Sequence, residues 1–172
     1  MNFLLEGQES ERLLFRKIQA SDFGAWLPFH QNSKTSQYWD GLPQNPKIAC
    51  RQDFDRTFFR YENQLGGKMA LISKKTEELI GLSGLLVQEV DGFKELEIAY
   101  SLLPKYWKQG YAIEAASRCK LYAIANNLAL SVISIVHIAN IPSQKVALKN
   151  GMKLDTTTDY HGNPVHIYRI LL

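Results

Sequence analysis

The stretch Leu102-Leu103-Pro104-Lys105-Tyr106-Trp107-Lys108-Gln109-Gly110-Tyr111-Ala112-Ile113-Glu114-Ala115 decides the fold, because it predicts a strand that runs through a short loop directly into a helix. The first amides of such a helix have no intrahelical partner and lie at the positive end of the helix dipole. They can bind phosphate oxygens if small residues, here Gly110 and Ala112, leave the approach open. A purely structural explanation is also open: Gly110 lets the loop turn and Ala112 packs on the sheet.

Two common phosphate-binding loops are excluded by the sequence. The chain contains neither the GxxxxGK[ST] pattern of P-loop proteins nor the GxGxxG pattern of Rossmann folds. A different phosphate-containing ligand is therefore expected.

The chain before this stretch predicts helices followed by an antiparallel meander. A strand is expected over 11–18, then a helix capped by Ser21 and Asp22 that Pro28 kinks or ends early. A second helix is expected over about 47–64, because Cys50, Phe54, Phe58 and Tyr61 recur at helical spacing. Strands over 68–73, 79–90 and 93–103 follow, and Asp91-Gly92 suits a tight hairpin turn between the last two.

The chain after it alternates helices and strands. A helix is expected over about 110–127, and the β-branched run 132–136 reads as a buried strand with local parallel pairing. A short helix over 142–149 and a closing hairpin of 153–160 and 165–172 complete the order β-α-α-β-β-β-α-β-α-β-β. The expected fold class is α/β with a mixed sheet.

Composition points to one globular domain over residues 1–172. The chain is 45% hydrophobic with a formal charge of +3, and it has no block of like charges, so nucleic-acid binding is not expected. Cys50 and Cys119 form no CxxC pair, which fits core thiols in a reducing compartment. The first residues lack the pattern of a signal peptide or membrane span, so we expect a cytoplasmic protein with no membrane partner.

Histidine spacing does not predict a metal site. The four histidines show no HExxH or comparable pattern, so we expect no metal: His30, His137, His161 and His166.

Three separated segments of the chain resemble the GNAT acetyltransferases, and within them the Rim-type branch that modifies ribosomal-protein N-termini. They are Glu97-Ile98-Ala99-Tyr100, the stretch from Pro104 to Ala115, and Asn140-Ile141-Pro142-Ser143 followed by Lys149-Asn150-Gly151-Met152. Their order and spacing fit this family across residues 11–172. The resemblance implies a mostly antiparallel central sheet, flanked by helices and splayed between its fourth and fifth strands, often with a bulge near residues 97–100.

The resemblance also implies acetyl-CoA as co-substrate. Backbone amides of residues 107–112 would bind its pyrophosphate, and the strand end at Leu102 would pair with its pantetheine amides. The cofactor-binding residues expected in this way are Leu102, Trp107, Lys108, Gln109, Gly110, Tyr111, Ala112 and Asn140.

By the same resemblance, Glu97 is the candidate general base and Ser143 the candidate donor to the departing thiolate. Each residue has a structural alternative. Glu97 could be a solvated or salt-bridged strand residue, while Asn140 could cap a helix in which Ser143 is the third residue. Tyr38 and Trp39, beside Gly41 and Pro43, are the expected acceptor contacts.

The expected function is an acetyl-CoA-dependent N-acetyltransferase that acts on a primary amine by direct attack on the thioester, and a protein N-terminal α-amine is the first candidate acceptor. A small-molecule acceptor, such as a polyamine, amino acid or amino sugar, is the first alternative. A non-catalytic CoA-binding module is the second. A homodimer that pairs through the C-terminal hairpin is also considered.

Overall fold

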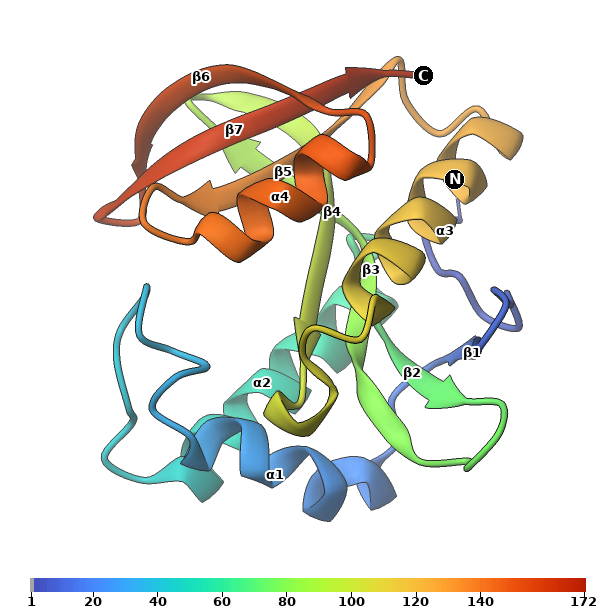
Figure 1. Cartoon of the computed structure of the whole chain (residues 1–172), viewed down its shortest axis with the longest axis vertical. Helices are drawn as coiled ribbons and strands as arrows, with labels where there is room; N and C mark the ends of the chain where they lie inside the picture. Colours follow the sequence, from blue (N-terminus) through green and yellow to red (C-terminus); the bar gives the residue numbers. More distant parts are fainter. Residues whose placement is uncertain (1) are drawn as a thin grey trace.

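The computed structural model describes residues 2–172 and contains one seven-stranded sheet in the order β1-β2-β3-β4-β5-β7-β6 (Figure 1). Its strands are β1 (Leu13–Arg16), β2 (Gly66–Ser73), β3 (Leu79–Val90), β4 (Phe93–Leu102), β5 (Ser131–His137), β6 (Lys153–Tyr160) and β7 (Asn163–Leu171). The helices are α1 (Phe23–Gln31), α2 (Pro46–Glu62), α3 (Tyr111–Ala125) and α4 (Ile141–Lys149), with short 3₁₀ turns η1 (Ala20–Asp22) and η2 (Pro104–Tyr106). The predicted order of elements is confirmed.

Side chains that alternate along β2 pack into two separate hydrophobic clusters, one on each face of the sheet. Met69 and Leu71 belong to the core beneath α3, whereas Ala70 packs with Trp26 and Phe54 of the α1–α2 pair. Successive side chains of a strand point to opposite faces, so α3 covers one face of this half of the sheet and α1 and α2 cover the other.

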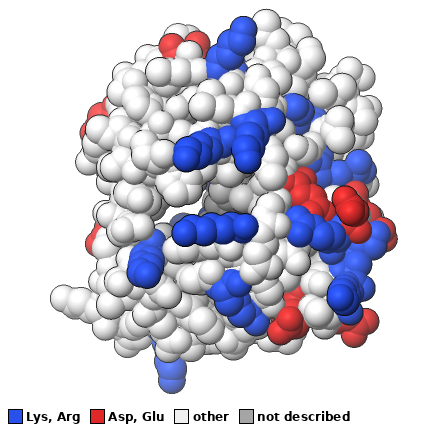
Figure 2. Space-filling model, viewed as in Figure 1, with Lys and Arg blue, Asp and Glu red and all other residues white. Residues whose placement is uncertain are grey.

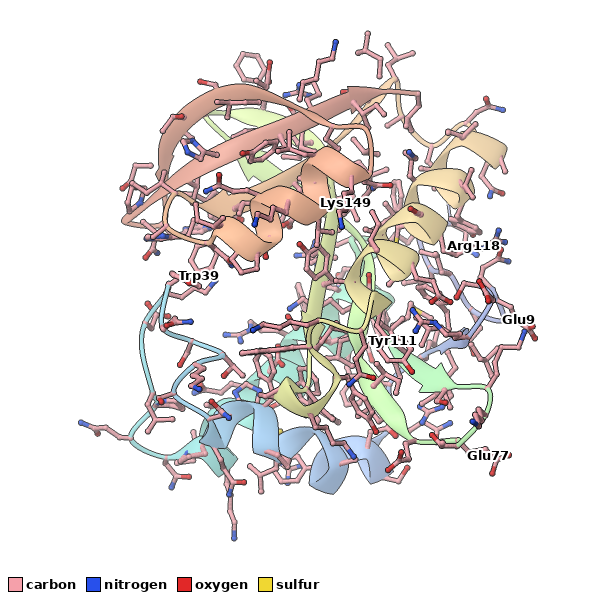
Figure 3. All side chains as sticks on the ribbon, in the orientation of Figure 1. Glu9, Trp39, Glu77, Tyr111, Arg118 and Lys149 are labelled. Carbon is pink, nitrogen blue, oxygen red and sulfur yellow. The ribbon has the colours of Figure 1, made fainter. Side chains whose placement is uncertain are left out.

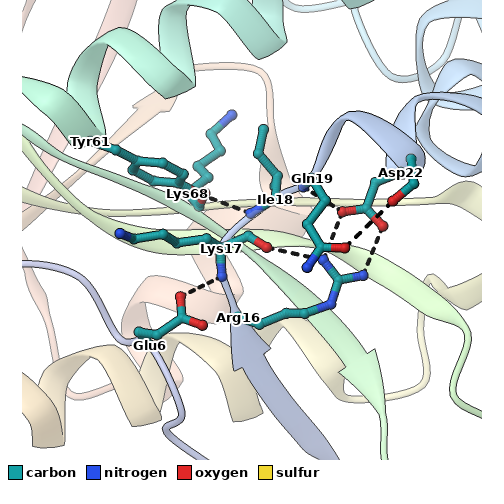
Figure 4. Close-up of polar contacts among 9 residues, drawn as sticks. Glu6, Arg16, Lys17, Ile18, Gln19, Asp22, Tyr61 and Lys68 are labelled. Atoms are coloured by element: carbon teal, nitrogen blue, oxygen red, sulfur yellow. Dashed lines mark hydrogen bonds and ion pairs between the residues drawn. The ribbon is translucent and has the colours of Figure 1, made fainter.

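The start of α1 differs from the prediction. Asp22 does not cap the helix with its side chain, because its carboxylate accepts hydrogen bonds from Arg16 (2.7 Å) and from the backbone N–H of Gln19 (2.8 Å) (Figure 4). Pro28 lies inside α1, which continues to Gln31 rather than ending at the proline.

The β4–β5 pair is the one parallel pairing in the sheet, and it is very short. All the other pairs described for residues 2–172 are antiparallel, whereas β4 and β5 share a single register pair, Glu97 with Ile133. A regular parallel ladder would next give the carbonyl of Ile98 a backbone N–H of β5. The side-chain hydroxyl of Ser134 donates to it instead, at 3.0 Å. The splay expected between the fourth and fifth strands is therefore present.

The bulge considered for residues 97–100 is absent from the β3–β4 pairing. Its register is unbroken from Gly81 opposite Leu102 to Val90 opposite Phe93. The splay thus arises on the β5 side of β4.

Two further observations concern the chain as a whole. Cys50 and Cys119 are buried free thiols, as predicted, and burial raises the pKa of each, to about 11 and about 12 respectively. Within residues 2–172, no helix is both long enough and apolar enough to span a bilayer.

Gly84 tests the close packing of β2 on β3. A Cβ added there would lie 2.1 Å from the carbonyl oxygen of Gly67, which is a backbone atom with little freedom to move. We expect Gly84→Ala to lower the free energy of unfolding by about 1–3 kcal/mol, a fall in Tm of roughly 3–10 °C. Thermal unfolding followed by circular dichroism measures it.

Gly24→Ala is the matched control. Gly24 lies in α1 and a Cβ there meets nothing within 4 Å, so this variant should be neutral or more stable by about 0.5–1 kcal/mol. Equal Tm values for the two variants would contradict this account of the β2–β3 contact.

Candidate active site

The N-terminus of α3 presents a row of backbone donors. Gly110 occupies the N-cap position with a φ of 84°, and no side chain caps the helix. The first intrahelical bond of this turn runs from the N–H of Glu114 to the carbonyl of Gly110, at 3.2 Å. The preceding amides therefore have no partner among residues 2–172; we call this row, Lys108 to Ile113, the anion site.

Arg12 of the β1 edge holds the anion site in place. Its guanidinium donates to a carboxylate oxygen of Glu114 (2.7 Å) and to the carbonyl of Gln109 (3.0 Å), and it lies 4.1 Å from the ring centroid of Tyr111. A Cβ on Gly110 would lie 3.3 Å from this guanidinium. Glycine at 110 thus permits both the left-handed turn and the close approach of Arg12.

Trp107 and Leu102 differ from the other residues expected to bind the cofactor. The N–H of Trp107 donates to the carbonyl of Pro104 (3.1 Å), so it is not a free donor. Its indole Nε1 donates to the carbonyl of Leu102 at 2.8 Å. Trp107 therefore ties the loop to the end of β4, and of the Leu102 backbone groups only the N–H remains for a ligand at the splay.

A cavity of about 450 Å³ opens at the splay. Residues from β2, β3, β4, β5, α2 and α4 contribute to its wall, together with the loop before α2. The cavity includes Glu97, Trp39, Asn140 and Ser143 from the residues predicted by sequence.

Glu97 lies on β4 with its side chain in this cavity, and the residue is only 8% exposed. Burial raises the pKa of its carboxyl group, although the side-chain amide of Gln88 donates to it at 2.7 Å and the charges of Lys68 and Arg60 oppose the rise. Glu97 is thus not solvated, and no ion pair among residues 2–172 contains it. A buried carboxylate with a raised pKa is suited to accept a proton.

The start of α4 lies across the splay from Glu97. The side-chain oxygen of Asn140 accepts a hydrogen bond from the N–H of Ser143 (3.2 Å), which makes Asn140 the N-cap and Ser143 the third helical residue. The hydroxyl of Tyr100 donates to the carbonyl of Ser143 at 3.4 Å. Burial raises the pKa of Tyr100 to about 12, so this hydroxyl stays protonated at neutral pH.

The loop between α1 and α2 reaches the C-terminal end of β5 through aromatic contacts. Tyr38 stacks on His137 with ring centroids 5.6 Å apart, and Trp39 meets the same ring edge-to-face at 6.2 Å. Trp39 lines the cavity, whereas Tyr38 supports it from outside. Figure 3 shows Trp39 at the edge of the opening, with Tyr111 at the start of α3 on the other side.

The surface around the opening is positively charged. Figure 2 shows a central hollow with Lys and Arg side chains above and below it, while the visible Asp and Glu side chains gather mainly at the right. Such a field attracts anionic ligands. Residues 2–172 contain no group of three or more His, Cys, Asp or Glu side chains placed to hold a metal ion.

Comparison with known proteins identifies the fold. Residues 12–153 match the acetyltransferase (GNAT) domain family. The chain belongs to the GNAT acetyltransferases. A relative in Bacillus subtilis, the uncharacterized N-acetyltransferase YoaA, is 30% identical over 149 residues, which cover 84% of this chain and 81% of YoaA. The chain is accordingly an acyltransferase.

Solved structures of other GNAT proteins share the fold. An acetyltransferase from Agrobacterium tumefaciens superposes with a TM-score of 0.82 at 23% identity, covering 100% of this chain and 98% of that one. The ribosomal-protein alpha-N-acetyltransferase RimL, in complex with coenzyme A, superposes with a TM-score of 0.77 at 15% identity, covering 96% and 97%.

Sequence reasoning missed several residues of this GNAT site. Ser134 ends the β4–β5 ladder, Gln88 holds the Glu97 carboxylate, and Lys68 enters the same cavity from β2. Tyr100 lies in one of the segments that resemble the family, and its sequence position alone does not indicate a role for its hydroxyl. An alternating strand pattern could have indicated that Tyr100 points to the face opposite Glu97, whereas the contacts of Ser134 depend on pairing distant in the sequence.

Glu114 links the anion site to β1, and its substitution has a defined pH dependence. Burial opposes ionisation of Glu114, but hydrogen bonds from Ser10 and Arg12 outweigh it and lower the pKa below the ordinary 4.5. The stabilisation that ionised Glu114 gives the fold is therefore fully present above the ordinary pKa of 4.5. It is lost as the pH falls through the lower pKa of Glu114 in the folded state. Glu114→Gln should reduce unfolding free energy by about 1–3 kcal/mol at pH 7, in urea denaturation.

The same comparison at pH 3.5 should give a smaller difference between wild type and Glu114→Gln. Glu62→Gln, at an exposed position near the end of α2, serves as the control and should match wild type at both pH values. A Glu114→Gln deficit that is equal at pH 7 and pH 3.5 would contradict the proposed ionic contact.

Proposed function

We propose that this chain transfers an acetyl group from acetyl-CoA to a primary amine, with a protein N-terminal α-amine as the acceptor. One observation carries the proposal: the buried carboxylate of Glu97 shares a cavity with Ser143 and Tyr100 at the point where β4 and β5 part. The fold shared with RimL, whose structure contains coenzyme A, supports the choice of acetyl-CoA and the Rim-type branch.

The residues present fit acetyl-CoA. The unpartnered amides of the anion site suit the pyrophosphate oxygens, and the left-handed φ of Gly110 starts the helix without a side-chain cap that would occupy them. When bound, acetyl-CoA supplies an activated acetyl thioester. The lysines and arginines around the hollow in Figure 2 favour its negative charge.

The backbone of β4 would orient the pantetheine arm. The N–H of Leu103 donates to the carbonyl of Ile80, so the alternation of an antiparallel pair turns the backbone groups of Tyr100 and Leu102 away from β3. Because pairing with β5 has already ended, the N–H and C=O of Tyr100 face the gap. Amide groups of the pantetheine arm are suited to replace the missing strand there.

Glu97 would remove the proton that blocks attack by the amine. An α-amino group with a pKa of about 7.7–8.0 is roughly 10–20% neutral at pH 7, whereas a lysine side chain is below about 0.1% neutral. A carboxylate with a moderately raised pKa therefore suffices for an α-amine, either directly or through a water molecule. This requirement favours an N-terminal acceptor over a lysine side chain.

Substitution of Glu97 tests this role. We expect Glu97→Gln to lower kcat by about 10²-fold and to remove the Glu97 ionisation from the acid side of the pH profile, leaving the fall that protonation of the acceptor amine causes. The sign follows from the raised pKa: wild type loses the ionised base as the pH falls, and glutamine has no proton to gain. Steady-state thiol release with an N-terminal peptide measures both effects.

Glu89→Gln, at an exposed position on the same sheet, is the control and should keep the wild-type profile. Acetyl-CoA affinity measured by calorimetry should be unchanged in Glu97→Gln. An unaltered pH profile in Glu97→Gln would reject the general-base role.

Two hydroxyl groups are candidates to stabilise the departing thiolate. Ser143 lines the cavity and Tyr100 lies beside the first turn of α4. With a pKa of about 12, the Tyr100 hydroxyl is a better hydrogen-bond donor than proton source for a thiolate whose pKa is about 8.5. Both residues would therefore act as donors.

Separate substitutions distinguish these donors. We expect removal of the hydroxyl that contacts the thiolate, in Ser143→Ala or in Tyr100→Phe, to lower kcat by about 10²-fold. The KM for acetyl-CoA should change by less than about threefold. Thr156→Val, at an exposed position on β6, serves as a control for loss of a hydroxyl. Weaker acetyl-CoA binding with unchanged kcat in both variants would contradict a leaving-group role for either hydroxyl.

Two expectations from the sequence stay predictions. A homodimer could form through β6, which lies at the edge of the sheet. A cytoplasmic location is consistent with two free thiols.

A further inference from the structure

The cavity beside Glu97 has an unusual balance of charge. Its charged wall residues are Arg56, Lys68 and Glu97, and the half-buried Arg60 lies close enough behind it to influence the Glu97 carboxyl group. Three cationic side chains therefore lie at or near the cavity, whereas Glu97, the proposed base, is the one carboxylate that residues 2–172 place in its wall. A cationic acceptor would add to this positive charge, whereas an anionic group would offset it.

Lys68 is the best-positioned cation. It is half-buried, and its ammonium group donates to the hydroxyl of Ser101 at 3.2 Å without a carboxylate within ion-pair distance. Its backbone is fixed as well, because the hydroxyl of Tyr61 donates to the Lys68 carbonyl (Figure 4). The ammonium group keeps donors free for a ligand.

The other two cations are only partly compensated. Asp53 lies 3.8 Å from the Arg56 guanidinium, but the same carboxylate accepts a hydrogen bond from Trp26 (3.0 Å) and contacts His30 (3.3 Å). The described hydrogen bonds of Arg60 go to backbone carbonyls, and its Nε is buried without a partner. Asp53 is therefore engaged mainly by other partners, although the charge of Lys68 also acts on it, and Glu97 is the one carboxylate that the described residues contribute to the cavity wall.

The positions of Glu97 and Lys68 in the cavity wall set the distance between a bound amine and a bound anion. Glu97, Ala99 and Ser101 alternate onto the same face of β4, with the small Ala99 between them. Four residues of strand span about 13 Å, and the long side chains of Glu97 and Lys68 shorten the distance between their charged groups. An amine at Glu97 and an anion at Lys68 would thus be separated by two to three residues of an extended peptide.

We propose that the acceptor carries a carboxylate two residues from its amine, as in a peptide N-terminus with an acidic third residue, and that Lys68 and Arg56 bind this carboxylate. The inference rests on the proposed function and specifies its substrate class. It makes polyamines and aminoglycosides poor acceptors, since these are cationic throughout.

The test compares tetrapeptide amides Ser-Ala-Xaa-Ala in which Xaa is Asp, Asn or Lys. A charge-assisted hydrogen bond predicts a kcat/KM about tenfold or more higher for the Asp peptide than for the Asn peptide, expressed mainly in KM. The Lys peptide and spermidine should be the poorest acceptors. A comparison of each free amino acid with its amide as acceptor shows whether the carboxylate of a small molecule can also bind to Lys68 and Arg56.

Variants assign the preference to these residues. Lys68→Gln should reduce the Asp-to-Asn ratio of kcat/KM to less than about threefold, and because the ratio compares two peptides on one variant, an effect of Lys68 on Glu97 cancels from it. Arg56→Gln, at an exposed position, should reduce the ratio in part. Lys75→Gln removes the same charge from the distant β2–β3 turn and should keep the full ratio. A ratio near one in wild type, or a ratio unaffected by both cavity variants, would overturn the inference.

A binding measurement separates this inference from the proposed function. Calorimetry with CoA present compares the N-acetylated Asp and Asn peptides as product ligands. Suppose that the Asp product binds more tightly, that Lys68→Gln abolishes this difference, and that no peptide is turned over. This result would support a carboxylate site at Lys68 and would refute a peptide N-terminus as the acceptor. Turnover without a preference for Asp would refute the inference alone.

Discussion

The site depends on one interruption in backbone pairing, the early end of the ladder between β4 and β5. Ser134 takes the carbonyl of Ile98, and beyond that point the backbone of β4 has no neighbouring strand on its β5 side. Unpaired backbone groups are costly unless water, side chains or a ligand satisfies them. The gap therefore creates both a need for hydrogen-bond partners and the space for an amide-containing ligand that supplies them.

Burial next to this gap gives Glu97 its chemical character. Burial removes the carboxylate from water and raises its pKa. The hydrogen bond from Gln88 and the nearby cations oppose this rise. The same cations make the cavity favourable for an anion once the carboxylate has accepted a proton. In the proposed reaction, proton transfer and acceptor choice would thus be coupled by charges that come from β2 and α2.

The order of the elements and the anion site could be predicted from sequence because both depend on local patterns. Gly110, the strand before it and the helix after it are contiguous in the chain, and the Asn140 cap is a local signal too. Lys68 and Ser134 could not be placed, since their roles depend on pairing between strands far apart in sequence. The Asp22 cap failed for a related reason: Arg16 on the preceding strand takes its carboxylate.

The most direct test of the account is an NMR titration of the ¹⁵N-labelled protein with coenzyme A. The account predicts saturable shifts of the backbone amides of Tyr111, Ala112 and Ile113 at the anion site, together with that of Tyr100 at the gap. Shifts confined to other surfaces, with these four amides unchanged at saturation, would contradict it.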